Sequence, residues 1–259
     1  MTPTLVFDIE TVPDIEGLRR LHGIDAKPSN REVADFALQR RRAATGQDFL
    51  PLHLHRVVAI ACALREADTF RVWSLGAPGD GEGELIRRFF DGIEKYTPQL
   101  VSWNGGGFDL PVLHYRAMIH GLSAPRYWDM GEDDREFRFN NYISRYHTRH
   151  LDMMDLLALY QPRNYVGLDD FARLCGFPGK LGMDGSQVWE AYDAGRLEEI
   201  RNYCETDVAN THLVFLKFQV LRGLYDDKRY RHECEIVRHW LSRSQEQHWQ
   251  AFQRAWPAN

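Results

Sequence analysis

The sequence predicts a mixed α/β sheet flanked by helices. Near the start of the chain, three apolar runs with strand character follow one another, and the last two form a hairpin. Helical and strand patterns then alternate, and the last part of the chain is almost wholly helical. Meandering strands followed by alternating helices and strands are typical of a mixed sheet with helices on its faces.

Composition places the chain among globular proteins. Its 259 residues are 44% hydrophobic and 12% aromatic, enough for one large domain with an ordinary core. The net charge of -5 gives no general attraction to nucleic acid, so such a contact would need a local basic patch. No apolar stretch reaches membrane-spanning length, the chain starts directly with a strand, and the four cysteines form no C-x-x-C pair. We therefore expect a cytoplasmic protein with reduced cysteines and no membrane partner.

The first strand includes residues 5–7 and is followed by a region with little strand character, residues 12–55, which we interpret as an insertion. Within it, Ser29 and Glu32 match a capping box, so a helix should begin there and run into the arginines at 40–42. Cations are favoured at a helix C-terminus by the helix dipole, which explains these arginines better than phosphate contact does.

The middle of the chain alternates between strands and helices, with boundaries set by turn residues and by Pro98. The first strand of the expected hairpin has an unbroken apolar run, so it should be buried on both faces. The expected segments are a strand at 57–64, a strand at 69–75, a helix from 84 to before Pro98, a strand at 100–103, a helix over 110–120, a strand at 148–151 and a helix over 152–160.

The remaining segments are expected to be helices at 168–175, 188–192, 197–223 and 230–252, with a glycine-rich loop from Gly176 to Gly185. We assign residues 1–223 to one domain containing the 12–55 insertion, and residues 224–259 to a helical extension of it. Trp240, Trp249 and Trp256 are expected to pack this tail on the core. The sequence does not predict an oligomeric state.

Two carboxylates share one face of the first strand. Side chains alternate along a strand, so Asp8 and Glu10 in Phe7-Asp8-Ile9-Glu10-Thr11 point to the same side. Like charges this close are unfavourable unless a cation lies between them, and hard divalent ions prefer oxygen ligands. The alternative is a solvated strand end, and the pair alone does not decide between the two.

A third carboxylate follows the strand that ends at Trp103. Asn104 and three glycines let the backbone turn tightly, and Asp109 then stands in the first turn of the next helix. Acidic residues are favoured there in any case, but the glycine run would also let a ligand approach the carboxyl end of the strand.

A fourth carboxylate lies inside the long helix near the end of the chain. Tyr203 and Asp207 are four residues apart and therefore share one face of that helix. Aspartate is intrinsically unfavourable in a helix interior, which suggests a purpose other than helix formation. Glu205 should point elsewhere, towards solvent.

In this order, three segments resemble the three exonuclease motifs of the DEDD superfamily, in its tyrosine-bearing subclass. The segments are Phe7-Asp8-Ile9-Glu10-Thr11, Asn104-x3-Phe108-Asp109 and Tyr203-x3-Asp207. The sequence is most similar to the proofreading exonuclease domain of B-family DNA polymerases and to stand-alone predicted 3'-5' exonucleases related to it, from Leu5 to about Gly223. The resemblance implies a ribonuclease H-like fold.

The resemblance also implies a two-metal-ion hydrolysis that releases nucleoside 5'-monophosphates. Asp8, Glu10 and Asp207 would hold one Mg²⁺ or Mn²⁺, and Asp8 would also contact a second ion held by Asp109. Tyr203 would orient the attacking water. Two such ions can stabilise both the attacking and the leaving oxygen of a phosphoryl displacement.

The expected substrate is the 3' end of single-stranded nucleic acid, with DNA favoured over RNA. Residues 135–150 carry four arginines against one glutamate, with four aromatic residues among them, a combination that suits phosphates and stacked bases. An aromatic hairpin packed on the core is an equal alternative for this segment. The residues expected to contact substrate are Thr11, Trp103, Asn104, Phe108, Tyr142, Arg145, Tyr146 and Lys180.

The same residues are compatible with other functions. An exoribonuclease would have the same motifs, and a binding module without activity would usually lack one of the carboxylates. His147-x4-Asp152 matches the histidine-bearing variant of the third motif but would leave Tyr203 unexplained. A set formed by His150, Asp152 and His212, with Arg222, has the spacing of a two-histidine, one-carboxylate iron oxygenase, but His212 falls in a predicted helix.

Overall fold

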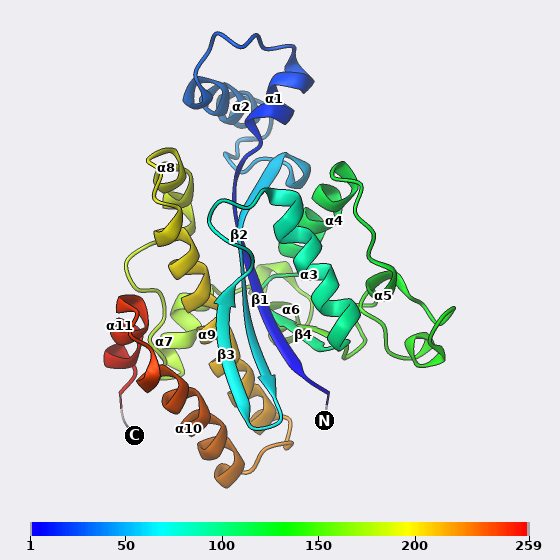
Figure 1. Cartoon of the computed structure of the whole chain (residues 1–259), viewed down its shortest axis with the longest axis vertical. Coiled ribbons are helices and arrows are strands. Elements are labelled where there is room, and N and C mark those ends of the chain that lie inside the picture. The colour runs from blue at the N-terminus through cyan, green and yellow to red at the C-terminus, as the bar shows by residue number, and fades with distance from the viewer. Residues whose placement is uncertain (1, 258–259) are drawn as a thin grey trace.

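The computed structural model describes residues 2–257 and contains a five-stranded mixed sheet in the order β3-β2-β1-β4-β5 (Figure 1). The three strands from β1 to β3 pair antiparallel, whereas β1 pairs with β4 and β4 with β5 in parallel. This confirms the predicted mixed α/β architecture. The strands are β1 (Thr4–Pro13), β2 (His55–Glu66), β3 (Thr69–Ser74), β4 (Gln99–Ser102) and β5 (His150–Asp152).

Helices cover both faces of the sheet, and helices also lie beyond both ends of its strands (Figure 1). They are α1 (Ile15–His22), α2 (Asn30–Thr45), α3 (Glu82–Tyr96), α4 (Asp109–Ile119), α5 (Pro125–Trp128), α6 (Met153–Leu157), α7 (Leu168–Leu174), α8 (Val188–Asp193), α9 (Leu197–Leu221), α10 (Asp227–Arg243) and α11 (Gln247–Ala255). No helix among residues 2–257 combines the length and the apolar character that crossing a membrane requires.

The sheet separates two hydrophobic cores. Phe7 and Ile9 on β1 point into the core beneath α3 and α4, while Val6 points into the core beneath α9. Because side chains alternate along a strand, Asp8 and Glu10 share the face of Val6. The central strand therefore presents both carboxylates to the helix α9.

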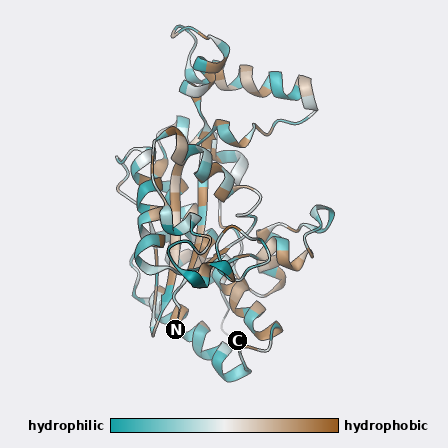
Figure 2. Cartoon of the chain, turned by 90° about the vertical axis from the view of Figure 1, so that its right-hand side faces the viewer, coloured by the Kyte–Doolittle hydropathy of each residue, from teal (hydrophilic) through white to brown (hydrophobic). Residues whose placement is uncertain are grey.

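The predicted insertion forms a small helical unit with a core of its own. Its buried apolar residues are Leu18, Val33, Ala37, Leu50 and Leu54. Figures 1 and 2 show α1 and α2 standing clear of the sheet, beyond the carboxyl end of β1. The Ser29 and Glu32 capping box is present as predicted. The prediction missed α1, although Asp14 caps its first turn and Gly23, at φ 61°, ends it.

Two predictions about the C-terminal part were wrong. The expected single helix over 230–252 is two helices, because the chain turns at Ser244 and returns to bury Trp249 and Phe252, which are 2% and 0% exposed. Glu205 does not point to solvent: its carboxylate accepts a hydrogen bond from Ser74 Oγ at 2.7 Å and lies 3.2 Å from His248 Nε2. The tail packs on the core as expected.

Residues 135–150 do not form a hairpin. They contain a short 3₁₀ turn, Arg135–Arg138, followed by loop up to β5. Phe137 is fully buried beneath Arg149, whose guanidinium lies 4.1 Å from the ring centroid. Part of the aromatic content of this segment therefore belongs to the core.

Candidate active site

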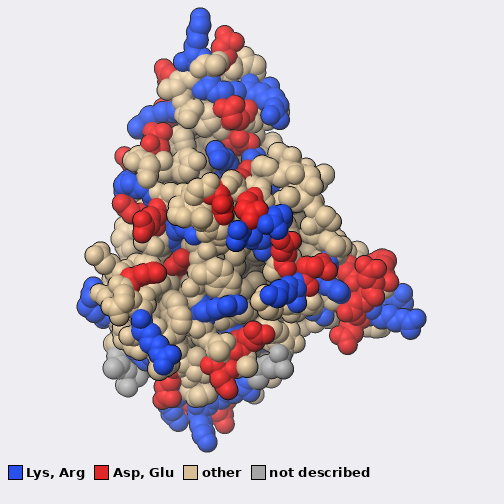
Figure 3. All heavy atoms as spheres, in the orientation of Figure 1, with Lys and Arg blue, Asp and Glu red and all other residues tan. Residues whose placement is uncertain are grey.

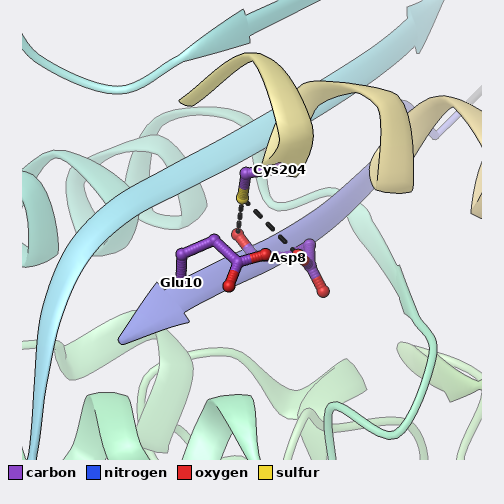
Figure 4. A group of neighbouring side chains, drawn as sticks. All are labelled: Asp8, Glu10 and Cys204. Carbon is purple, nitrogen blue, oxygen red and sulfur yellow. Dashed lines mark hydrogen bonds between the residues drawn. The ribbon is translucent and has the colours of Figure 1, made fainter. Parts of the chain in front are cut away.

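Asp8 and Glu10 meet beneath α9 (Figure 4). Glu10 is 8% exposed and Asp8 is half-buried, and one ligand atom of each lies within 4.8 Å of the other and of Cys204 Sγ. The Cys204 thiol donates to the backbone oxygen of Asp8 at 3.4 Å and to its Oδ2 at 3.5 Å. The pairing of β1 with β2 changes register directly after Glu10, where Val58 of β2 is left without a partner. Bulges commonly redirect side chains beside functional sites.

Asp109 is the first residue of α4 and comes to the same place from across the sheet. Its Oδ1 accepts the backbone N–H of Ile9 at 3.1 Å, so the start of α4 is tied to β1 between the other two carboxylates. Asp109 is 3% exposed. Its carboxylate is therefore a buried group that the sheet and the helix position together.

The glycine run before Asp109 is shaped mainly by close approach within the chain. A Cβ on Gly105 would lie 2.3 Å from Ser102 Oγ, so a side chain does not fit there. Asp152 Oδ2 accepts the N–H of Gly106 at 2.8 Å, and its Oδ1 accepts that of Asn104 at 3.0 Å. Asp152 also caps α6, and through its bonds to Asn104 and Gly106 it supports the turn that carries Asp109.

The long helix α9 supplies Tyr203 and Asp207, which are 5% and 6% exposed. Lys180 lies beside both: its ammonium donates to the Tyr203 hydroxyl and is 3.7 Å from Asp207 Oδ2. The other oxygen of Asp207, Oδ1, is buried and has no hydrogen-bond partner among residues 2–257.

Lys180 is held in place by its backbone. The side chain of Asn210 on α9 bonds both backbone groups of Gly179, at 3.0 and 2.9 Å. Asp169 on α7 accepts the N–H of Lys180 at 2.6 Å. Gly179 has φ +70°, and a Cβ there would lie 2.4 Å from Asp169 Oδ1. The glycine-rich loop thus fixes the position of one ammonium group in the site.

Burial raises the pKa of every carboxylate in the group, and repulsion from the others raises the pKa of Asp8 and Glu10 further. Burial raises the pKa of Asp8 well above its usual value, and the charges of the other three carboxylates raise it further. Burial and then Asp207 raise the pKa of Glu10, against the opposing effect of Lys180. Burial raises the pKa of Asp109 to about 7 and that of Asp207 to about 6. Burial and the same charges also raise the pKa of Tyr203, which stays a neutral phenol.

The residues predicted to contact substrate differ in their surroundings. Thr11 Oγ1 is 2.9 Å from His55 Nδ1, and Phe108 packs edge-on to His55 with centroids 5.2 Å apart, next to Asp109. Trp103 stacks on Phe171 at 5.7 Å, at the end of β4.

The prediction for Tyr142 was wrong. This side chain is 2% exposed and its hydroxyl donates to the backbone oxygen of Pro98, so it offers no ring to a base. Tyr146, in contrast, is 74% exposed. Arg145 pairs with Asp155 at 2.8 Å and covers the ring of Tyr160 at 4.6 Å.

Sequence reasoning missed three residues that build the site. Cys204 was expected only to be a reduced cysteine, although its place beside Tyr203 in the third motif was a usable signal. Asn210 is fully buried three residues after Asp207, and Asp169 lies on another helix. No sequence pattern links these two to Lys180, because their contacts arise only when α7 and α9 pack together.

Two alternative sites are ruled out by the fold. His212 lies against Phe70 on β3, with centroids 4.7 Å apart, whereas His150 and Asp152 belong to β5 at the opposite edge of the sheet. The proposed iron ligands are therefore not brought together. His147 accepts the N–H of Asn141 at 3.0 Å, and Asp152 serves the turn before α4, so neither takes the place of Tyr203 or Asp207.

Comparison with known proteins identifies the family to which this fold belongs. The chain belongs to the family described as "Predicted 3'-5' exonuclease related to the exonuclease domain of PolB", whose model matches residues 47–256. The predicted relationship and the predicted class of enzyme, a 3'-5' exonuclease, are thereby confirmed. The matched range contains Asp109, Tyr203 and Asp207 and begins after Asp8 and Glu10.

Similar proteins are DNA polymerases. The chain is 25% identical over 144 residues to the catalytic subunit of DNA polymerase epsilon from Saccharomyces cerevisiae, covering 53% of this chain and 6% of that protein. It is 24% identical over 136 residues to a DNA polymerase of Archaeoglobus fulgidus, covering 51% of this chain and 17% of that protein. The family B DNA polymerase of Pyrobaculum calidifontis has a similar fold, with a TM-score of 0.50 and 19% identity over 85% of this chain and 25% of that one. The chain thus corresponds to a small part of each relative.

Proposed function

We propose that this protein is a metal-dependent 3'-5' exonuclease that releases nucleoside 5'-monophosphates from single-stranded nucleic acid. The observation that carries the proposal is the convergence of Asp8, Glu10, Asp109 and Asp207. They come from β1, α4 and α9 and lie close enough for the charges of the other three to raise the pKa of Asp8, and Lys180 is the only cation, within residues 2–257, that pairs with any of them. Four mutually repelling, largely buried carboxylates are unfavourable for folding, which points to a requirement for them in function.

The residues present fit a pair of divalent ions. All the candidate ligands are carboxylates, the donor type that Mg²⁺ and Mn²⁺ prefer. The buried Oδ1 of Asp207 lacks a hydrogen bond within residues 2–257, and the pKa of each carboxylate is raised, as expected of groups whose charge a bound cation would compensate. Asp8, Glu10 and Asp207 would hold one ion, and Asp8 with Asp109 the other. When bound, the ions would supply Lewis-acid stabilisation of the attacking and leaving oxygens.

Tyr203 and Lys180 have roles that follow from their contacts. The Tyr203 oxygen accepts a hydrogen bond from Lys180, and its own proton, which faces Asp207, would orient a water molecule held at that carboxylate. Because the pKa of Tyr203 is raised, the phenol positions the water and does not remove its proton at neutral pH. The Lys180 ammonium, close to the carboxylates, is placed to stabilise negative charge on the phosphate.

Aromatic side chains around the site suit a single strand. Phe108 adjoins Asp109, and Trp103 is fixed at the end of β4 by its Nε1 bond of 3.1 Å to the backbone oxygen of Val166. The exposed Tyr146 and its neighbour Arg145 would contact bases and phosphates further from the 3' end. DNA is the favoured substrate because the similar proteins are DNA polymerases.

The test uses single-stranded DNA and RNA oligonucleotides labelled at the 5' end, incubated with Mg²⁺ or Mn²⁺. Wild type should produce a ladder shortened from the 3' end, and Asp8→Ala should abolish it. Glu205→Gln is the matched control, because Glu205 is on the same helix as Asp207 but bonds Ser74 instead. No ladder on either substrate with either metal contradicts the proposal. A ladder on RNA alone would identify the protein as an exoribonuclease.

We further assign residues 1–223 to the exonuclease domain, with 12–55 as an insertion and 224–259 as an extension packed on it. Support for a single unit comes from Trp249 and Phe252, which lie in the same core as Tyr203 and Val208 of α9. The extension would then stabilise the helix that carries part of the site.

A further inference from the structure

An aromatic side chain of the insertion projects beside the site. Phe49 lies in the segment between α2 and β2 and is 55% exposed, although the next residue, Leu50, is buried at 4%. Its ring centroid is 5.6 Å from that of Phe108 and 4.8 Å from that of His55. Phe49 therefore adds an exposed ring to the half-buried Phe108 and contributes little to the core of the insertion.

Two of the three rings are linked to residues that adjoin the carboxylates in the sequence. Phe108 immediately precedes Asp109, and His55 is 2.9 Å from the hydroxyl of Thr11, which immediately follows Glu10. The three rings thus lie between the part of the site on β1 and the part at the start of α4. These rings are therefore candidates for contact with a strand whose 3' end reaches the carboxylates.

The backbone that carries Phe49 is held on both sides. Arg41 Nε donates to the backbone oxygen of Phe49 at 3.1 Å, and His55 Nε2 lies 3.1 Å from the backbone oxygen of Leu50. On the preceding side, Arg42 forms an ion pair with Asp48. An exposed ring on an anchored backbone loses little conformational entropy when a ligand binds.

The surrounding charge suits phosphates. Residues 40–56 contain four arginines and one aspartate, a local charge of +3 on a chain of -5; Arg41 and Arg42 bond within the segment, which leaves the exposed Arg40 and Arg56 as the candidates for phosphate contact. Figure 3 shows that Lys and Arg side chains are numerous around the end of the molecule that α1 and α2 form, with acidic ones among them. Arginines beside exposed rings are the combination by which proteins hold single strands without reading sequence.

We propose that Phe49 and Phe108 form a stacking platform for nucleobases near the 3' end, so that the insertion acts as part of the substrate-binding site. This inference rests on the proposed nuclease function and extends it to a segment outside the three motifs. Stacking on a ring face tolerates every base, so the platform should contribute affinity and not sequence preference.

The test compares Phe49→Leu with wild type, because leucine keeps an apolar side chain and removes the ring face. Phe36→Leu is the matched control: Phe36 is 42% exposed on α2, but it packs against His22 and not against Phe108. Binding is measured by fluorescence anisotropy of a 5'-labelled oligothymidylate in EDTA, where hydrolysis is blocked. Phe49→Leu should weaken binding about tenfold, Phe36→Leu should leave it unchanged, and Phe49→Trp should restore it.

Two further readouts separate stacking from a structural defect. In steady-state digestion, Phe49→Leu should raise KM and leave kcat unchanged, since the ring acts on binding alone. A 2-aminopurine near the 3' end should be quenched on binding to wild type and less quenched with Phe49→Leu. Equal binding and quenching for Phe49→Leu and wild type would overturn the platform.

The outcomes also distinguish this inference from the proposed function. Digestion that depends on Asp8 but not on Phe49 would overturn the platform and leave the nuclease intact. Binding that depends on Phe49, without any digestion by wild type, would overturn the nuclease and leave the platform.

Discussion

The most informative prediction concerns Asp109→Asn, which should make the metal-free protein more stable and inactive. Asparagine retains an oxygen that can accept the N–H of Ile9, a bond of 3.1 Å in wild type. It also removes one of four carboxylates that repel one another in a buried place. The substitution should therefore leave the start of α4 in position while relieving the repulsion.

The magnitude follows from the pKa. Burial raises the pKa of Asp109 from 3.8 to about 7, a difference that corresponds to roughly 4 kcal/mol against the ionised form at most, at 1.36 kcal/mol per unit. Because the neighbouring carboxylates share this penalty, we expect Asp109→Asn to gain about 1 to 3 kcal/mol. Because the pKa of Asp109 is higher in the folded protein than in the unfolded one, its carboxylate does not destabilise the folded state below the unfolded pKa, where it is protonated in both states. The destabilisation grows as the pH rises and is complete above the folded pKa. The gain should thus be small near pH 4 and complete above pH 7.

Urea unfolding in EDTA at several pH values measures this difference, and Mg²⁺ addition supplies the second half of the test. Mg²⁺ should stabilise wild type and have much less effect on Asp109→Asn, because ion binding adds stability only where the ligands exist. If Asp109→Asn is no more stable than wild type in EDTA above pH 7, the reasoning that a buried, ionised Asp109 among repelling carboxylates destabilises the protein is refuted.

Three further predictions concern a buried ion-pair group, the tyrosine of the site and the glycine-rich loop. Arg116→Met should lower the free energy of unfolding in urea by about 3 to 5 kcal/mol, because it leaves Glu82 and Asp14 as buried charges without their partner. The control Arg87→Met, at an exposed ion pair, should lower it by under about 1 kcal/mol, and equal losses would contradict this prediction. Tyr203→Phe should lower kcat roughly 10- to 100-fold with unchanged thermal stability, and an unchanged kcat would remove the water-orienting role. Gly179→Ala should lower kcat by displacing Lys180, since the new Cβ would lie 2.4 Å from Asp169 Oδ1. Gly182→Ala, at φ +98° with open space around it, should lower stability and leave kcat unchanged; the same kcat for both variants would contradict the role of the loop.

The sheet could be predicted because its signals are local. The apolar runs of β2 and β3, the capping box at Ser29 and the helical spacing before Pro98 each fix one element without reference to the rest of the chain. The two helices at the C-terminus were merged because the turn at Ser244 contains neither glycine nor proline. What bends the chain there is the burial of Trp249 and Phe252, which is a tertiary effect.

The candidate site was predictable in its carboxylates and unpredictable in its surroundings. Alternation on β1 places Asp8 and Glu10 on one face, and helical spacing aligns Tyr203 with Asp207. The ammonium of Lys180 reaches Tyr203 only because Asn210 holds the glycine loop, a contact between residues 31 apart. Tyr142 was misassigned because an aromatic residue in a basic segment gives no sign of its burial.

The most direct measurement is anomalous diffraction from crystals soaked with Mn²⁺ and a nucleoside 5'-monophosphate. We predict manganese between Asp8, Glu10, Asp109 and Asp207, with the phosphate beside Tyr203 and Lys180. A second group of possible ligands, Glu205, Glu246 and His248, serves as an internal comparison. Manganese at that group alone, or at neither place, would contradict the central claim that the four carboxylates form a metal-dependent nuclease site.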